Sequence, residues 1–175
     1  MVVAAFAADP AARWMYPEAA RYAAHFPDFV KAFGGRAVAC GTAHMIGEGA
    51  GAALWLPPGI TPDDAGVESL IRRSIPPHAH DALFAVFDQM GSYHPAEAHW
   101  HLPLIAVHPA CQRMGYGAAL LRHMLAAIDE QRLPAYLESS NPDNIPLYER
   151  QGFTVLGVIQ VAGSPPITPM LRRPR

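Results

Sequence analysis

Residues 99–121 read HWHLPLIAVHPACQRMGYGAALL, in which a long apolar stretch, HWHLPLIAV, is followed after a short polar segment by two glycines, Gly115 and Gly117. The apolar stretch is typical of a β-strand that is buried on both faces. Pro103 lies inside it and cannot donate a ladder hydrogen bond, so we expect a bulge or an unpaired edge there. Apolar residues then recur with helical spacing, which predicts a helix over residues 117–131. The stretch therefore predicts a strand, a glycine loop and a helix in succession.

The other predicted elements place this unit in an α/β fold with at least one parallel crossover. Further helices are predicted at residues 61–74, 80–90 and 145–150, and one or two at residues 11–33, broken near Pro17 and Pro27 and ended by Gly34-Gly35. Strands are predicted at residues 36–45, 51–56, 135–139, 153–161 and 167–171, the first two joined as a hairpin by the turn IGEGAG. The chain has 175 residues without a linker or repeat, so we expect a single domain over residues 1–175.

The composition argues against several classes of partner. The formal net charge is -2 and no basic run is present, so neither nucleic acid nor a membrane surface is an expected partner. No apolar run reaches the roughly 20 residues of a spanning helix, and the opening MVVAAFAADP lacks the basic residues of a signal peptide. Cys40 and Cys111 have no metal or redox spacing, which favours a reduced, cytoplasmic setting.

Histidine is frequent, and two HxH pairs raise the question of a metal site. The pairs are His78 with His80 and His99 with His101. A metal site needs further ligands, and no neighbouring residues complete a set around either pair. We therefore expect no metal.

The glycine loop is a candidate anion site. The first turn of a helix leaves about four backbone N–H groups without partners, and the helix dipole adds positive charge there. Glycine lets the backbone come close to an anion. No lysine follows Gly115 or Gly117 as a Walker loop requires, and Leu120 stands where the dinucleotide fingerprint needs a third glycine. Taken alone, the loop fits either a phosphate site or a plain strand-to-helix turn.

Two separated motifs narrow this choice: VHPACQRMGYG at residues 107–117 and NIPLYERQGF at residues 144–153. In this order they resemble the GNAT superfamily of acetyl-CoA-dependent acyltransferases. Within it, LESSNPDNIPLYERQGF at residues 137–153 is most similar to puromycin N-acetyltransferase and its relatives. The strong resemblance covers residues 100–157. Members usually have a strand before their opening helix, so we expect that first strand to be missing or replaced here.

The resemblance implies a mixed, mostly antiparallel central sheet with helices on both faces. It also implies that the strand before the loop splays from its neighbour and pairs with the pantetheine arm of acetyl-CoA, the cosubstrate. The implied cofactor-binding residues are Ile105, Ala106, Val107, Gln112, Arg113, Met114, Gly115, Tyr116, Gly117, Ala118, Asn144 and Tyr148. The resemblance further implies that Asn144 bonds pantetheine and that the hydroxyl of Tyr148 protonates the departing sulfur.

The base that removes a proton from the acceptor amine stays open at this point. Glu138 ends a strand that faces the cofactor strand. His99 and His101 alternate with Trp100 on the cofactor strand itself, so both point to one face. Glu138, His101 and a water relay are the alternatives.

By likeness to the puromycin enzyme, we expect an N-acetyltransferase that acts on a small amine by direct attack on the thioester. Two alternatives stay open: acetylation of a protein or peptide amine, and a CoA-binding module without catalysis. A peptide needs an open groove, whereas a small molecule needs a closed aromatic pocket. We expect a monomer or a homodimer.

Overall fold

A six-stranded sheet with the order β1-β2-β3-β4-β6-β5 organises the molecule. The computed structural model describes residues 1–161 and 163–175. The strands are β1 (Ala43–Ile46), β2 (Gly51–Leu56), β3 (Trp100–Val107), β4 (Ala135–Ser139), β5 (Thr154–Val155) and β6 (Thr168–Arg172). Only β3 and β4 are parallel, and the other neighbours are antiparallel. The predicted α/β fold, with a mixed and mostly antiparallel sheet, is confirmed.

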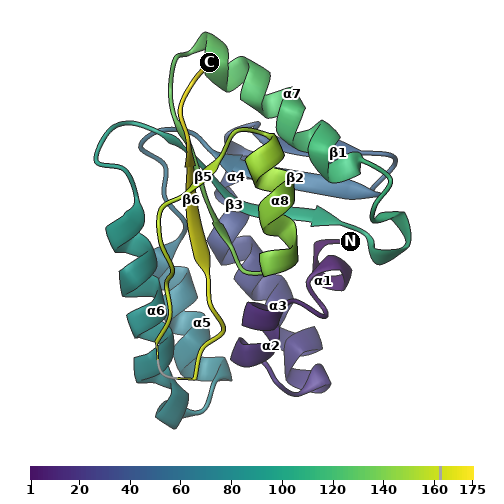
Figure 1. Ribbon diagram of the computed structural model, residues 1–175. Coiled ribbons are helices and arrows are strands. Elements are labelled where there is room, and N and C mark those ends of the chain that lie inside the picture. Colours follow the sequence, from purple (N-terminus) through teal and green to yellow (C-terminus); the bar gives the residue numbers. More distant parts are fainter. Residues whose placement is uncertain (162) are drawn as a thin grey trace.

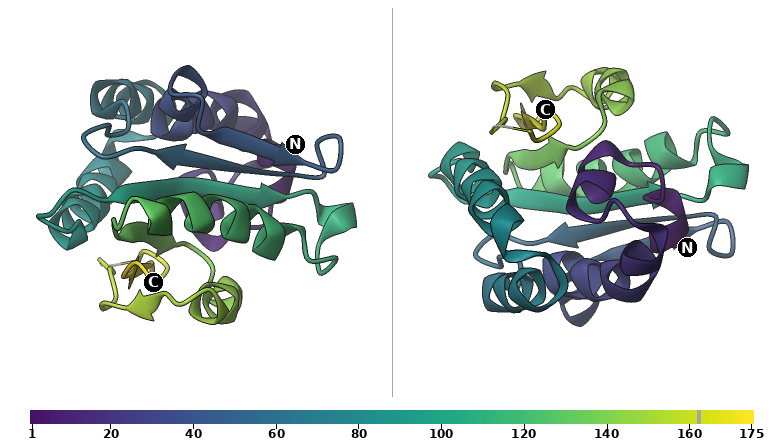
Figure 2. Two further views of the ribbon diagram at one scale, coloured as in Figure 1. Left: turned by 90° about the horizontal axis from the view of Figure 1, so that it is seen from above. Right: turned by 90° about the horizontal axis from the view of Figure 1, so that it is seen from below.

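Helices cover both faces of this sheet (Figures 1 and 2). They are α1 (Val2–Ala5), α2 (Pro10–Met15), α3 (Ala19–Gly34), α4 (Arg36–Ala39), α5 (Asp64–Ser74), α6 (His80–Tyr93), α7 (Tyr116–Glu130) and α8 (Ile145–Arg150). Short 3-10 turns lie at Pro77–Ala79, Pro109–Cys111 and Pro142–Asn144. One core cluster joins α3 and α5 to the sheet through Leu54 and Leu104, and another joins α7 and α8 to it through Leu102 and Leu137. Among the described residues, no helix is long and apolar enough to span a membrane.

The N-terminal half departs from the predicted elements at two places. Pro27 lies inside α3, which continues without a break from Ala19 to Gly34. Proline costs this helix a hydrogen bond, but successive ring stacks along its buried face stabilise it, with centroids 4.6, 5.5 and 5.1 Å apart. The rings are those of Tyr22, Phe26, Phe29 and Phe33. Residues 36–39 form α4 instead of a strand, and the strand begins only at Ala43, after a turn at Gly41 with φ 69°.

The strand predicted over residues 153–161 is wrong for most of its length. β5 has two residues, and beyond it Ile159 makes a single bridge to Ile167. The chain leaves the sheet at Gly157, where a Cβ would lie 2.5 Å from the hydroxyl oxygen of Tyr93. A larger residue at this position would have to displace the end of the Tyr93 side chain. No strand precedes α1 among the described residues, and β1 forms one edge of the sheet.

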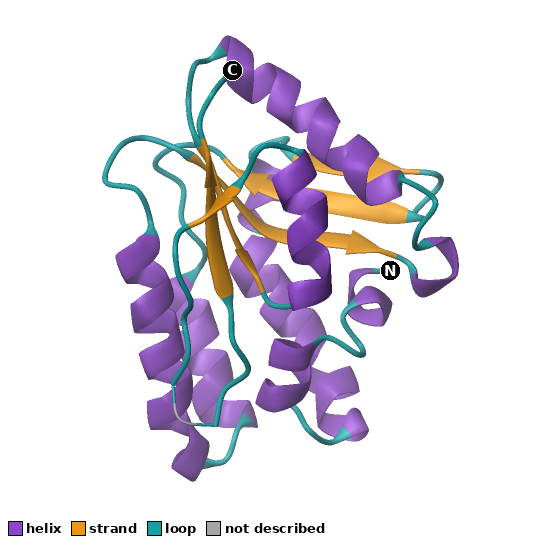
Figure 3. Ribbon diagram, viewed as in Figure 1, coloured by secondary structure: helices purple, strands orange, loops and turns teal. Residues whose placement is uncertain are grey.

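The parallel ladder between β3 and β4 ends early, and this break positions the candidate site. Residues 100–102 pair with residues 135–137, although β3 continues to Val107. On its other side, β3 places both Leu102 and Pro103 opposite Trp55, which confirms the bulge expected at the proline. Beyond it, β3 stays with β2 while β4 follows β6 in another direction (Figure 3).

A buried ion pair between Arg172 and Asp129 links β6 to α7. Arg172 donates from both terminal nitrogens to the two carboxylate oxygens of Asp129 at 2.7 Å, and its Nε donates to the carbonyl of Gln151 at 2.9 Å. The arginine is only 4% exposed. Its hydrogen bonds lower the pKa of Asp129 below the ordinary value of 3.8. The pair thus joins the C-terminal strand to the strongest predicted helix.

Asp129→Asn is expected to lower the free energy of unfolding by about 3 kcal/mol at neutral pH, because it leaves the Arg172 guanidinium buried without its partner. Since the folded protein lowers the pKa of Asp129, the carboxylate's contribution is present above about pH 4 and is lost as pH falls through the folded pKa. Urea unfolding at neutral pH and near pH 3 should therefore show a gap between wild type and variant that narrows in acid. An equal gap at both pH values would contradict this account.

Candidate active site

The free edge of β3 offers backbone groups to a ligand. The backbone N–H of His108 donates to the carbonyl of Ala50 at 2.7 Å. This bond fixes which residues of β3 direct their backbone groups toward β2 and which direct them away, because the two kinds alternate along an antiparallel ladder. By that alternation Ala106 directs its backbone groups to β2, whereas Ile105 and Val107 direct theirs to the side that β4 has left. The side chain of Gln112 donates weakly to the Val107 carbonyl, at 3.4 Å. The edge at Ile105 and Val107 can therefore take an extended polar chain.

The loop between β3 and α7 presents six successive amides. The first helical hydrogen bond of α7 comes from Ala119 to the carbonyl of Gly115 at 3.0 Å. Among the described residues, the amides of residues 113–118 donate to no protein group. Positive φ at Arg113 (63°) and Gly115 (87°) turns this backbone. Such a run of unpaired N–H groups at a helix start suits the pyrophosphate of a nucleotide.

Helix α8 brings Tyr148 to the same region. A Cβ on Gly117 would lie 3.4 Å from the Leu147 side chain, so α8 packs against the start of α7. Tyr148 is 5% exposed within the core on this face, and Asn144, one turn earlier, is exposed. Burial, together with the charge of Asp9, raises the pKa of the Tyr148 hydroxyl. The phenol is therefore protonated at neutral pH and is a proton donor.

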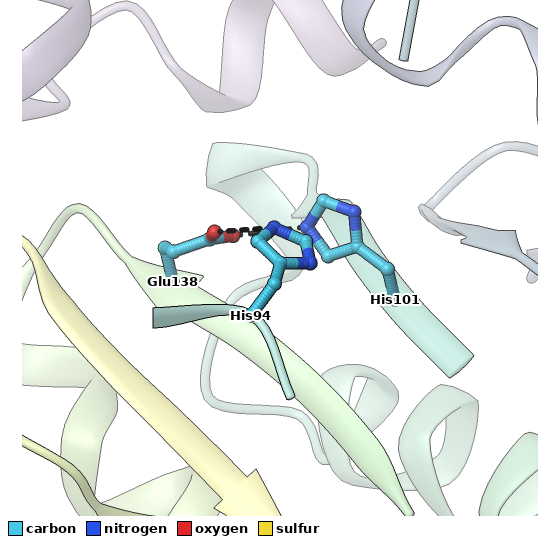
Figure 4. A group of neighbouring side chains, drawn as sticks. All are labelled: His94, His101 and Glu138. Carbon is cyan, nitrogen blue, oxygen red and sulfur yellow. Dashed lines mark hydrogen bonds and ion pairs between the residues drawn. The ribbon is translucent and has the colours of Figure 1, made fainter. Parts of the chain in front are cut away.

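On the opposite face of the sheet, two imidazoles meet one carboxylate (Figure 4). His101 Nε2 lies 2.9 Å from Glu138 Oε2, and His94 Nε2 lies 3.2 Å from Glu138 Oε1. The side chains of His101 and Glu138 are 5% and 3% exposed. Burial raises the pKa of Glu138, but the two imidazoles outweigh burial and hold it at about 2. Glu138 is therefore a carboxylate, and the structure brings together Glu138 and His101, the two residues predicted as candidate bases.

Two hollows adjoin Glu138. A narrow apolar cavity of about 80 Å³ lies beside Pro103 and Leu104, where β3 and β4 separate. Its polar lining is Asp9, Glu138 and Ser140, and its rings are Phe6, Trp14, Phe26, Phe29, Phe33 and Phe87. A wider cleft of about 610 Å³ reaches Glu138 from the side of α6 and is lined by His94, His99 and His101. An acceptor can thus approach the break in the sheet from the face opposite the glycine loop.

Two polar residues of this site were not predicted from the sequence. His94 follows α6, and its position beside Glu138 depends on how that helix packs, which no local pattern reveals. Asp9 caps α2 by accepting from Ala12 at 3.0 Å, and it also accepts from Ser140 at 2.6 Å across the site. The sequence DPAA predicts the capping role of Asp9, but the contact with Ser140 exists only in the folded chain.

The comparisons with known proteins agree with this geometry. The family model "Acetyltransferase (GNAT) family" matches residues 79–153. A solved structure described as histone acetyltransferase HPA2 and related acetyltransferase from Corynebacterium glutamicum is 27% identical, with a TM-score of 0.64 over 99% of this chain and 87% of that one. SsHAT, at 23% identity, has a TM-score of 0.50 over 85% of this chain and 81% of its own, and shows the shared fold. The family match over residues 79–153 and the 27% identical structure support an acyltransferase of the GNAT type, whereas SsHAT supports the fold alone.

The conformation of the glycine loop leads to a matched pair of variants. Gly115 has φ 87° with open space around it, so Gly115→Ala strains the backbone and is expected to cost about 1–2 kcal/mol of unfolding free energy. Gly117 has no positive φ, and a Cβ there makes only ordinary contacts, so Gly117→Ala should leave stability unchanged or raise it by up to about 1 kcal/mol. Urea unfolding measures both values. Equal losses in the two variants would contradict the left-handed turn at Gly115.

Proposed function

We propose that this chain, a GNAT acetyltransferase by its family match and fold, transfers an acetyl group from acetyl-CoA to the amine of a small molecule. The observation that carries the proposal is the break between β3 and β4. Among residues 1–161 and 163–175, this break has a free strand edge and six unpaired amides on one side, and a buried carboxylate with two imidazoles on the other. We propose a single domain in which no metal takes part, and the cytoplasmic location stays a prediction.

The chain's own groups suit the cosubstrate. Ile105 and Val107 would pair with the pantetheine arm, residues 113–118 would hold the pyrophosphate, and Asn144 would bond the arm near its end. Acetyl-CoA supplies the thioester that the amine attacks. Tyr148 gives its proton to the departing sulfur, since a buried phenol with a raised pKa is protonated before the step. Burial of this side chain keeps the hydroxyl in one place.

His101 is the base that we propose, and Glu138 orients it. An alkylammonium has a pKa near 10, so an amine needs help to lose its proton. Glu138, with a pKa of about 2, is a weak proton acceptor. His101 donates from Nε2 to that carboxylate, which leaves Nδ1 with a lone pair, and among the described residues Nδ1 has no hydrogen-bond partner. The carboxylate also stabilises the imidazolium that forms, as in a catalytic triad.

The shape of the hollows favours a small apolar amine. Aromatic rings line most of the narrow cavity, and its lining also includes the carboxylates of Asp9 and Glu138, whose negative charge would attract an ammonium group. A cavity of about 150 Å³ accepts benzene. The narrow cavity beside Pro103 has a volume of about 80 Å³, so without rearrangement it has room for a short alkyl group. A ring would fit only if the lining side chains moved.

A protein or peptide amine is the second candidate. The relative at 27% identity is described as a histone acetyltransferase and related acetyltransferase. The wider cleft has Asp64 on its wall, which offers an acidic side chain to a basic peptide; Glu97 also lines this cleft, but its carboxylate pairs with Arg173. A CoA-binding module without catalysis is the third candidate, and the presence of Tyr148 beside the loop argues against it.

The deciding experiment is a panel of amines with acetyl-CoA, read by release of free thiol. Butylamine and phenethylamine represent apolar amines, glucosamine represents polar ones, and peptides with a free α-amine or lysine represent protein acceptors. Turnover highest with the apolar amines supports the proposal. Turnover only with peptides would contradict the small-amine proposal and favour the second candidate, acetylation of a protein or peptide amine. A thermal shift with CoA but no turnover on any amine would favour the binding module.

Tyr148→Phe separates catalysis from binding. Removal of the hydroxyl is expected to lower kcat by about 10- to 1000-fold, because the thiolate then leaves without its proton donor. The affinity for acetyl-CoA should stay within about twofold, since the ring still packs in the core. Steady-state kinetics and calorimetric binding measure the two quantities. A variant with unchanged kcat would remove Tyr148 from the mechanism.

A further inference from the structure

Three side chains with metal-binding atoms converge near the C-terminal end of β4 (Figure 4). His101 comes from β3, Glu138 from β4, and His94 directly follows α6. His101 Nε2 lies 2.9 Å from Glu138 Oε2, and His94 Nε2 lies 3.2 Å from Glu138 Oε1. One ligand atom from each residue lies within 4.8 Å of the other two. The group contains His101 of one HxH pair without its neighbour His99, so the spacing in the sequence does not reveal it.

Hydrogen bonds behind His94 fix which of its ring nitrogens is available to a metal. His99 Nδ1 lies 2.8 Å from the carbonyl of Glu97, and because a carbonyl only accepts, this nitrogen carries a proton. The Nε2 atom of a neutral His99 then accepts from His94 Nδ1 at 3.0 Å. A neutral His94 therefore turns the lone pair of its Nε2 toward Glu138. Hydrogen bonds of this kind orient the histidine ligands of metal sites.

The carboxylate oxygen beside this lone pair makes no hydrogen bond. Glu138 Oε1 is buried and has no hydrogen-bond partner among the residues that the structure describes, although His94 Nε2 is 3.2 Å away. Two acceptor atoms thus face each other, and the carboxylate side chain is only 3% exposed. A buried charge is costly unless it is paired or binds a metal. A cation between the two atoms would satisfy both.

The donor set selects zinc. Two imidazoles and one carboxylate, with a fourth position left to water, form many zinc sites, whereas calcium and magnesium prefer oxygen ligands. Ligand atoms around a tetrahedral zinc ion lie about 3.3–3.6 Å apart. The contacts of 2.9 and 3.2 Å are close to this spacing, so small rotations of the side chains suffice. All three residues line the wider cleft, which gives the ion a route from solvent.

We propose that His94, His101 and Glu138 form an inhibitory zinc site that blocks acetyl transfer when it is filled. His101 Nε2 donates to Glu138, and it must lose this proton to bind zinc. Solvent takes the Nε2 proton and returns one to Nδ1, so the imidazole stays neutral and exchanges one tautomer for the other. His101 Nδ1 then has no lone pair for the proton of the amine. The block rests on the proposed function, whereas the binding of zinc does not.

The hydrogen bonds around the two imidazoles indicate that zinc binds reversibly. His94 has an outer partner in His99, but His101 Nδ1 has no hydrogen-bond partner among residues 1–161 and 163–175. Outer partners of this kind typically contribute about 10- to 100-fold in metal affinity. One of the two histidine ligands lacks this contribution, so we expect a chelator to remove the ion.

Calorimetric titration with zinc chloride tests the binding without any acceptor amine. The full chain, treated first with EDTA, is expected to bind one ion. His94→Ala removes a ligand and should weaken this binding by at least about 10-fold, and His99→Ala, which removes the outer partner, should weaken it by about 10-fold. His78→Ala, at an exposed histidine outside both hollows, is the matched control and should bind zinc as the wild type does.

The block is measured on an amine that the enzyme acetylates. Acetylated product is counted by mass spectrometry, because zinc also binds the free thiol of released CoA. Zinc should stop wild-type turnover and EDTA should restore it. The His94→Ala variant should keep most of its own rate in EDTA when the zinc that stops the wild type is added.

Several results would overturn the proposal. Absence of zinc binding would do so, as would equal binding by wild type and His94→Ala. Bound zinc that leaves turnover unchanged, or turnover that EDTA removes, would contradict the inhibitory role. If zinc binds as predicted and no amine is acetylated, the zinc site stands and the proposed function alone is contradicted.

Discussion

The structure depends on the early end of the parallel hydrogen-bond ladder between β3 and β4. β3 pairs with β4 over residues 100–102 and then diverges from it, at the position where Pro103 makes a bulge against β2. A proline has no N–H to give to a neighbouring strand, so continued pairing would leave a carbonyl without a partner. Separation of the strands resolves this conflict, but among the described residues it leaves the outward backbone groups of Ile105 and Val107 without a strand partner, with only a weak side-chain hydrogen bond from Gln112 to the Val107 carbonyl. A ligand that hydrogen-bonds like a strand is the natural partner for such an edge.

The bulge also decides which side chains meet. Trp100, Leu102 and Ile105 pack on the face of α7, whereas His101 and Leu104 lie on the opposite face with α3. Glu138 shares that second face and ends beside His101. The donor side and the proton-accepting side are thus separated by the sheet and meet only where its strands diverge. This arrangement keeps the buried carboxylate away from the loop in which the anionic pyrophosphate is proposed to bind.

The sequence predicted the parts of this architecture that rest on local rules. The proline bulge, the glycine turn, α7 and α8 follow from one residue's missing donor, from positive φ and from apolar spacing. Sequence patterns failed where long-range packing decides: Pro27 lies inside a helix that stacked aromatic rings stabilise, and after Leu156 the chain keeps only the bridge of Ile159 to Ile167 and passes close to Tyr93 at Gly157. Glu138 and His101 were expected as separate candidates. Their contact, and the presence of His94 beside them, required the fold.

Hydrogen exchange with and without CoA tests the central claim most directly, because it reads the backbone that the account assigns to the cosubstrate. Bound CoA should slow exchange at the amides of Ile105 and Val107 and across residues 113–118, whereas the Ala106 amide, directed to β2, should change little. Protection of this alternating edge together with the loop is the predicted result. Binding of CoA without slower exchange at either place would contradict the account.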